Sequence, residues 1–196
     1  MPVILLAARA LAAFNAPVLA VGRGIAIVLM ALMVLVILAQ IFFRFVIGDA
    51  LNWTEEAARF MMLWVAGVAA PTAYRRGGFV AIDMVVLMMP RIIGSLLTLF
   101  LLFLALIVLV VGVQIGWGEV TGFGGRFATA ALKYPTDLGF ETWVKVPRSW
   151  MMASLLVGVT SMAIVNVELI LRAIATMAGR EADLPVIPES ASVGAE

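Results

Sequence analysis

Three long apolar segments, each next to charged residues, decide what this chain can fold into. They are residues 24–43, 92–118 and 149–171. A helix needs about 20 apolar residues to cross the roughly 30 Å of hydrocarbon in a bilayer. Hydrophobic residues make up 64% of the chain and charged residues only 13%, whereas a soluble domain has about 25% charged residues. The sequence therefore predicts an integral membrane protein.

A fourth span is less plain, because its apolar part, residues 60–74, is too short to cross the membrane alone. Extending it back to Glu55 gives a full-length helix and places Glu55, Glu56 and Arg59 in its first turns. We therefore predict an all-α, four-helix membrane protein whose single membrane domain covers residues 1–178. Its predicted spans are residues 24–46, 55–74, 92–117 and 149–171.

Two shorter apolar segments predict helices that lie along the membrane surface. Residues 1–22 are apolar but interrupted by Arg9, Asn15 and Pro17, which predicts an interfacial helix separate from the first span. Residues 79–90, between spans two and three, are too short to cross the membrane and predict a second one.

Two polar segments complete the chain. Residues 179–196 are acidic and contain two prolines, and we expect a disordered cytoplasmic tail. Residues 117–147 form the one sizeable loop, whose first part contains four glycines and is expected to be flexible. The role of this loop stays open.

Tryptophan and arginine placement predicts the topology. Trp53, Trp117, Trp143 and Trp150 fall at span ends on one side of an up-down bundle, and aromatic rings favour the membrane–water boundary. Arginines are in excess on the other side, which favours both termini in the cytoplasm. The arginines assigned to that side are Arg9, Arg23, Arg75, Arg76, Arg91, Arg172 and Arg180.

Residue types that are missing exclude several functions. The chain has no cysteine and no histidine, so thiolate metal sites, iron–sulfur clusters, His-ligated haem and His-dependent catalytic triads are excluded. The formal net charge of +1 gives no indication of nucleic-acid binding. We therefore predict no catalytic residue, no metal site and no cofactor, and a protein that is not an enzyme.

The densest polar cluster opens the second span, from Asn52 to Arg59. Asn52 and Glu55 match a capping box, and Glu55 with Arg59 has the spacing of an intrahelical ion pair. Arg44, at the end of the first span, is placed either to pair with Glu56 or to reach lipid phosphates. The cluster predicts structural anchoring of the helix, or alternatively a contact site for a partner.

Small residues at four-residue spacing predict helix contacts. Gly112 with Gly116 in the third span, and Ser154 with Gly158 in the fourth, allow two helix backbones to approach closely in lipid.

The stretch from residue 44 to residue 91 resembles the small membrane subunit of tripartite ATP-independent periplasmic (TRAP) transporters, the DctQ-like family. The resemblance covers a Trp-x-Glu-Glu-x-x-Arg run, a basic turn followed by Asp, and a Met-Pro before the third span. The sequence departs from the family pattern at Phe79, where His is common, and in its long outer loop. The residues that carry it are Arg44, Asp49, Trp53, Glu55, Glu56, Arg59, Trp64, Arg75, Arg76, Gly77, Asp83, Met89 and Pro90.

This resemblance implies a place in the bacterial inner membrane and two protein partners besides lipid. They are a large multi-span subunit that holds the transport pathway and a periplasmic binding protein that selects an organic acid. Coupling of import to a sodium gradient is expected in the large subunit. The chain itself would be a non-catalytic scaffold. The alternative is a stand-alone four-helix membrane scaffold or assembly protein with no role in transport.

Overall fold

The computed structural model describes residues 2–49, 51–76, 90–135, 143–180, 184, 185 and 187, and this part of the chain is dominated by four long helices. The helices are α1 (Pro2–Phe42), α2 (Asn52–Arg75), α4 (Arg91–Thr121) and α5 (Ser149–Met177). Among the described residues, three helices are long and apolar enough to cross a membrane, namely Val3–Ile47, Ile92–Thr121 and Ser149–Met177. The predicted all-α membrane fold is confirmed.

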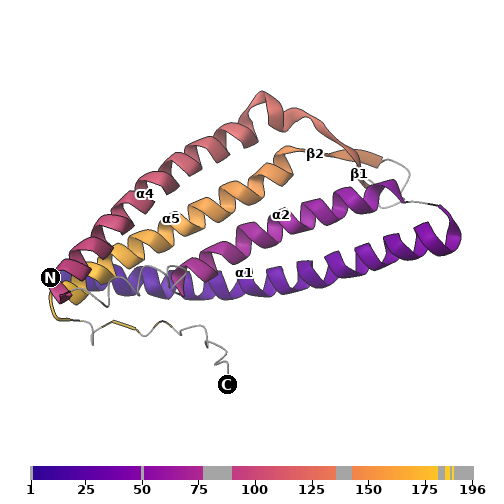
Figure 1. Cartoon of the computed structure of the whole chain (residues 1–196). Coiled ribbons are helices and arrows are strands. Elements are labelled where there is room, and N and C mark those ends of the chain that lie inside the picture. The colour runs from indigo at the N-terminus through magenta and orange to yellow at the C-terminus, as the bar shows by residue number, and fades with distance from the viewer. Residues whose placement is uncertain are drawn as a thin grey trace, which may run out of the picture.

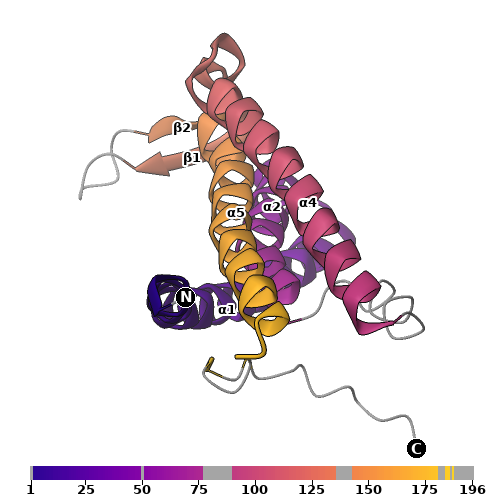
Figure 2. The ribbon, with the colours of Figure 1, turned by 90° about the vertical axis from the view of Figure 1, so that its left-hand side faces the viewer.

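The four helices form a row rather than a square. α2 and α5 pack against each other in the centre, α1 packs on α2, and α4 packs on α5. Figure 1 shows the row spreading toward one end, and Figure 2 shows α1 and α4 on opposite sides of the central pair. Because α1 and α4 each have one main neighbour, both expose wide apolar faces.

The sequence predicted that residues 1–22 form an interfacial helix separate from the first span. This prediction is wrong. α1 is continuous from Pro2 to Phe42 with Pro17 inside it, a length of about 60 Å. A proline inside a helix removes one backbone hydrogen bond, but the helix is packed against the bundle on both sides of Pro17. Buried side chains recur every three or four residues on the face toward the bundle, at Leu5, Ala8, Ala12, Asn15 and Leu19.

The first span ends in a π-helical turn, η1 (Phe43–Ile47), closed by Gly48 in the left-handed region at φ 78°. α2 is about 36 Å long at 1.5 Å per residue, enough to cross a membrane, but charged side chains near both ends make it less apolar than the other three. Its assignment as a membrane span therefore stays a prediction. The predicted interfacial helix of residues 79–90 lies outside the described residues, except for Pro90.

The loop between α4 and α5 is more ordered than its glycines suggested. A short 3-10 helix, η2 (Phe123–Arg126), leads into an antiparallel hairpin of β1 (Ala128–Pro135) and β2 (Trp143–Pro147). Gly125 allows η2 to pack closely on the end of α4, because a Cβ at this position would lie 2.7 Å from the Val120 carbonyl oxygen. The ring of Tyr134 in β1 stacks on Trp150 at the start of α5, with centroids 5.7 Å apart.

The end of the bundle that carries this hairpin is called the hairpin end below. Four tryptophans lie there, at the start of α2, the last turns of α4, the start of β2 and the start of α5. Each is about half exposed; they are Trp53, Trp117, Trp143 and Trp150. The end where α1 begins and α5 finishes is called the opposite end.

Candidate functional site

In the described part of the chain, two charged clusters and two close helix crossings are the features of interest for function. The first cluster lies at the hairpin end, in the first turns of α2. Arg59 Nη2 donates to Glu55 Oε1 at 2.6 Å, and this ion pair has the four-residue spacing expected from the sequence. The side chains of Arg59 and Glu55 are 70% and 68% exposed, so the pair lies on the surface of the chain.

The predicted capping box is wrong. α2 begins at Asn52, so Asn52 lies in the first turn and Leu51 is the cap residue, without a side-chain cap. The Thr54 hydroxyl donates to the Leu51 carbonyl oxygen at 2.7 Å. This contact ties a buried side chain to the residue that precedes the helix, but it does not satisfy a free backbone N–H of the first turn, as a side-chain cap would.

Glu56 holds the hairpin instead of pairing with Arg44. Its carboxylate accepts backbone N–H bonds from Ala130 (3.0 Å), Ala131 (2.6 Å) and Leu132 (2.9 Å) in β1. Three successive N–H groups that converge on one carboxylate form an anion-binding nest. The hairpin therefore supplies to Glu56 the donors that Arg44 would have supplied under one of its two predicted roles.

Arg44 itself lies in η1, where its guanidinium is 6.0 Å from the centroid of the Phe45 ring. No ion pair with Glu56 is present among the described residues. Trp64 lies one turn beyond Phe60 in α2, and the centroids of the two rings are 6.4 Å apart. The indole N–H of Trp64 is buried without a hydrogen-bond partner among the described residues.

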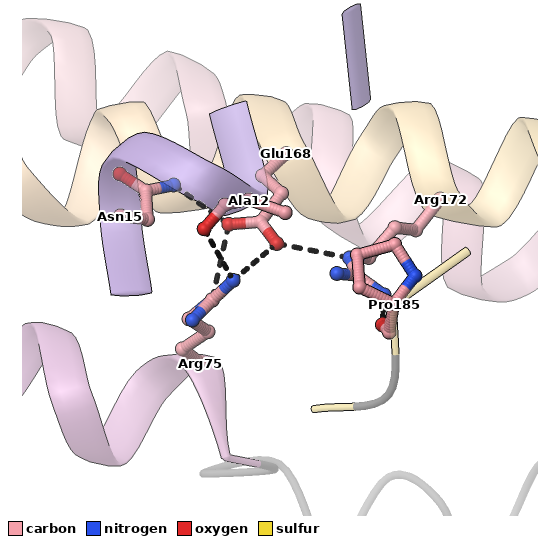
Figure 3. Close-up of polar contacts among 6 residues, drawn as sticks. All are labelled: Ala12, Asn15, Arg75, Glu168, Arg172 and Pro185. Carbon is pink, nitrogen blue, oxygen red and sulfur yellow. Dashed lines mark hydrogen bonds and ion pairs between the residues drawn. The ribbon is translucent and has the colours of Figure 1, made fainter. Parts of the chain in front are cut away.

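The second cluster, at the opposite end, is a buried network around Glu168 of α5 (Figure 3). Arg75 of α2 binds both carboxylate oxygens, with Nη2 at 2.7 Å from Oε1 and Nε at 3.0 Å from Oε2. Arg172 Nε donates to Oε1 at 2.9 Å, and Asn15 Nδ2 of α1 donates to Oε2 at 2.6 Å. The side chain of Glu168 is 0% exposed, and its charge is met by two guanidinium groups.

Neighbouring contacts extend this network to all four helices. The Tyr74 hydroxyl of α2 donates to Asn166 Oδ1 at 2.7 Å, and Asn166 Nδ2 donates to the Leu102 carbonyl oxygen of α4 at 3.0 Å. Arg172 Nη1 also donates to the Pro185 carbonyl oxygen at 2.9 Å. The residue 185 segment, within the tail predicted to be disordered, thus contacts the end of α5.

The sequence analysis used Arg75 and Arg172 only to assign the topology and did not join them to Glu168. Glu168 lies near the end of an otherwise apolar segment, with Arg172 four residues on, and Arg75 ends the neighbouring span on the same side. An ionisable residue within a span needs a partner in the protein. Applied to Glu168, that rule would have pointed to Arg75 and Arg172, whereas nothing marked Asn15, since it fell in a segment expected to lie apart from the bundle.

The small residues lie where helices cross. A Cβ on Gly112 or Gly116 of α4 would meet α5, at 2.9 Å from Val159 Cγ1 and 3.3 Å from Leu156 Cα. The sequence expected Ser154 and Gly158 to serve helix packing, and the structure places both against Gly67 of α2.

The contact with Gly67, which the sequence reasoning missed, is between backbones. A Cβ on Gly158 would lie 2.7 Å from the Gly67 carbonyl oxygen, and a Cβ on Gly67 would overlap the Ser154 carbonyl oxygen. Neither position therefore has room for a Cβ, and the absence of side chains lets the two backbones approach closely. One glycine within a span of larger side chains gave no such signal in the sequence.

Buried polar groups in this arrangement serve to join helices and loops. Apart from the Trp64 indole N–H, each buried polar side chain of the described residues is hydrogen-bonded within the chain. Residues 33–176, about three quarters of the chain, match the family described as "Tripartite ATP-independent periplasmic transporters, DctQ component". The chain belongs to the DctQ family. It is therefore a small membrane component of a TRAP transporter.

The part of the chain that matches the DctQ family includes both charged clusters except Asn15 and Pro185, and both helix crossings described above. The first half of α1 lies outside it. None of the curated proteins compared with this DctQ chain matches it.

Proposed function

We propose that this DctQ component is a non-catalytic scaffold that assembles with a large multi-span TRAP subunit in the bacterial inner membrane. In this proposal the large subunit holds the transport pathway and the sodium coupling. A periplasmic binding protein selects an organic acid and delivers it. Family membership supports the assignment to a TRAP transporter, and the finer roles are inferred from it together with the interior of the bundle.

The observation that carries the proposal is how the buried polar groups are used. Glu168 has donors at both carboxylate oxygens, and Asn166 is engaged through both its amide oxygen and its amide nitrogen. A pathway for an organic acid needs polar groups that a moving solute can reach. Groups that are saturated by contacts between helices hold a scaffold together instead.

Reconstitution tests this proposal by omission. Uptake of an organic acid into liposomes should require the DctQ chain, the large subunit, the cognate binding protein and an inward sodium gradient. The DctQ chain alone should give no uptake above empty liposomes. Uptake by the purified chain alone would contradict the scaffold role, and uptake by the large subunit without the DctQ chain would favour the stand-alone alternative.

The proposed topology places the hairpin end in the periplasm and both termini in the cytoplasm. The absence of native cysteine allows single introduced cysteines to be labelled without background. In intact cells, Gly124→Cys at the hairpin end should react with a membrane-impermeant maleimide, and Ala178→Cys at the opposite end should not. The reverse labelling pattern would invert the topology.

A further inference from the structure

Two lysines face each other across the hairpin. Lys133 of β1 and Lys145 of β2 are directly opposed in its antiparallel register. Directly opposed residues project from the same face of a hairpin, with Cβ atoms about 4.5–5.5 Å apart, and like charges at this spacing repel each other. No hydrogen bond or ion pair to either side chain is present among the described residues. The two charges are therefore left to water or to an anion from outside this part of the chain.

The lysines lie on the hairpin face that points away from the bundle. Successive side chains of a strand alternate between its two faces. The residues next to the lysines form the opposed pair on the other face, and one of them, Tyr134, stacks its ring on Trp150 of α5. The outer face thus carries Lys133 and Lys145, both exposed, together with Trp143, which is 52% exposed.

This outer face lies close to a polar boundary of the membrane. α5 has 29 residues and is about 43 Å long at 1.5 Å per residue, which matches the roughly 40–45 Å of a bilayer with its headgroup regions. The first turn of α5 is therefore at the headgroups. Lys145 precedes α5 by four residues, which span at most about 14 Å, and the contact of Tyr134 with Trp150 holds Lys133 beside the same turn. Trp143 fits this position, since indole rings favour the boundary.

The chemistry of the face matches a phosphate group with a net negative charge. Two ammonium groups side by side act as paired point charges, which suit the oxygens of a phosphate. The apolar spans of this chain ensure that phospholipid phosphates surround it at the boundary. An anionic headgroup relieves the repulsion between the lysines, whereas a zwitterionic headgroup brings a cation of its own.

We propose that Lys133 and Lys145 bind the phosphate of an anionic phospholipid in the leaflet at the hairpin end, with Trp143 in the headgroup layer beside them. The lipid attaches the hairpin to the membrane through its outer face, as Glu56 attaches it to α2. The inference does not require the large subunit, so it can fail without the proposed function. The two acids between the strands, Asp137 and Glu141, lie outside the described residues.

Lipid titration tests the lysine pair. The full chain in a neutral detergent is titrated with phosphatidylglycerol or phosphatidylcholine, and bound lipid is measured by native mass spectrometry. Lys133→Gln should weaken phosphatidylglycerol binding about fivefold, and the double variant with Lys145→Gln about tenfold or more, because each lysine near an anionic headgroup adds to the attraction. Lys133→Arg with Lys145→Arg keeps both charges and should keep the affinity. Arg126→Gln, at an exposed arginine of η2, is the matched control and should leave binding unchanged.

Thermal unfolding separates lipid binding from folding. The glutamine variants lose no contact within the described residues, so without lipid they should unfold at the same temperature as the unmodified chain or slightly above it, since a repulsion is removed. Phosphatidylglycerol should raise the unfolding temperature of the unmodified chain and not that of the double variant, and inorganic phosphate should raise neither. Equal phosphatidylglycerol binding by the double variant and the unmodified chain, an equal loss in Arg126→Gln, or a rise with inorganic phosphate would overturn the lipid site.

A fluorescent label on Trp143→Cys tests where the outer face lies while both lysines stay in place. In nanodiscs that contain phosphatidylglycerol, this label should be quenched by lipids that carry a spin label at the headgroup. The same label on Ile107→Cys, on the exposed apolar surface of α4, is the control and should be quenched by spin labels on the acyl chains. Quenching of the Trp143→Cys label by a water-soluble quencher alone would place the face in solution. That result would overturn the lipid site and favour an acidic protein surface as its occupant.

Discussion

The two charged clusters share one sequence pattern, a glutamate with an arginine four residues later, but occupy different environments. In Glu55 and Arg59 the pair lies on one helix, and both side chains are about 70% exposed. In Glu168 and Arg172 the glutamate is 0% exposed, and Arg75 and Asn15 reach it from two other helices. Identical spacing therefore gives one surface contact and one junction of the bundle.

The difference lies in what each charge loses if its partner is removed. An exposed ion pair contributes little, because water or lipid headgroups solvate either charge well. A buried carboxylate has no such alternative, so removal of one member leaves the other charge uncompensated. Burial and the number of helices joined, not the spacing, determine the contribution of each cluster to stability.

The largest effect is expected for Glu168→Ala, which leaves the guanidinium groups of Arg75 and Arg172 without their counter-charge. Breaking a buried ion pair costs about 3–5 kcal/mol, and this change also removes the contact with Asn15. The free energy of unfolding, measured by denaturation in detergent, should fall by that order. Glu55→Ala is the matched control and should change it by at most about 0.5 kcal/mol. Equal losses in the two variants would show that burial does not separate the clusters.

The next effect concerns the helix crossing that brings Arg75 of α2 to Glu168 of α5. Gly158→Leu places side-chain atoms where the Gly67 backbone lies, and forced separation of packed elements costs about 1–3 kcal/mol. The stability loss should be accompanied by weaker protection of the network end in hydrogen exchange. Gly118→Leu in α4, where a Cβ meets nothing within 4 Å, should be tolerated.

The same contrast explains which features were predictable from sequence. Membrane helices follow from apolar segments, because their length and composition are local properties, and the family pattern is local as well. The network depends on Asn15, Arg75 and Glu168 meeting from three helices, and such meetings depend on how the helices cross. The single glycine at position 67, where α2 and α5 cross, does not predict a helix contact until its partner Gly158 is known.

The continuous α1 was missed for a related reason. Pro17 and Asn15 read locally as interruptions, and only the packing of the buried face of α1 along α2 and α5 outweighs them. The hairpin was missed because the side chain that holds it, Glu56, belongs to α2. Glu56 looked like half of an ion pair, since nothing in the sequence showed three backbone N–H groups of β1 arriving at its carboxylate.

An intermediate effect is expected for Glu56→Gln, which lies between the two extremes of the comparison. An amide keeps one acceptor oxygen but presents a donor to backbone N–H groups, so at least one of the three bonds is lost. A hydrogen bond to a charged group contributes about 1.5–3 kcal/mol. Hydrogen exchange at Ala130, Ala131 and Leu132 should accelerate, while α5 stays protected. Glu119→Gln, at an exposed acid of α4, is the control, and unchanged exchange at β1 in Glu56→Gln would contradict the anchoring role.

The smallest effect is expected for Arg59→Ala, despite its place in the densest polar cluster of the sequence. Its pair with Glu55 lies along one helix and is exposed, so its loss should change the free energy of unfolding by only about 0.3–0.5 kcal/mol. The double variant with Glu55→Ala should differ little from either single variant, and added salt should reduce the remaining difference.

The isolated chain and its complex with the large subunit should be compared, because the cluster was open to two interpretations. If Arg59→Ala leaves the isolated chain unchanged but lowers recovery of the large subunit, the exposed pair is a partner contact. If it destabilises the isolated chain as much as Glu168→Ala does, the separation between a surface pair and a buried junction is wrong.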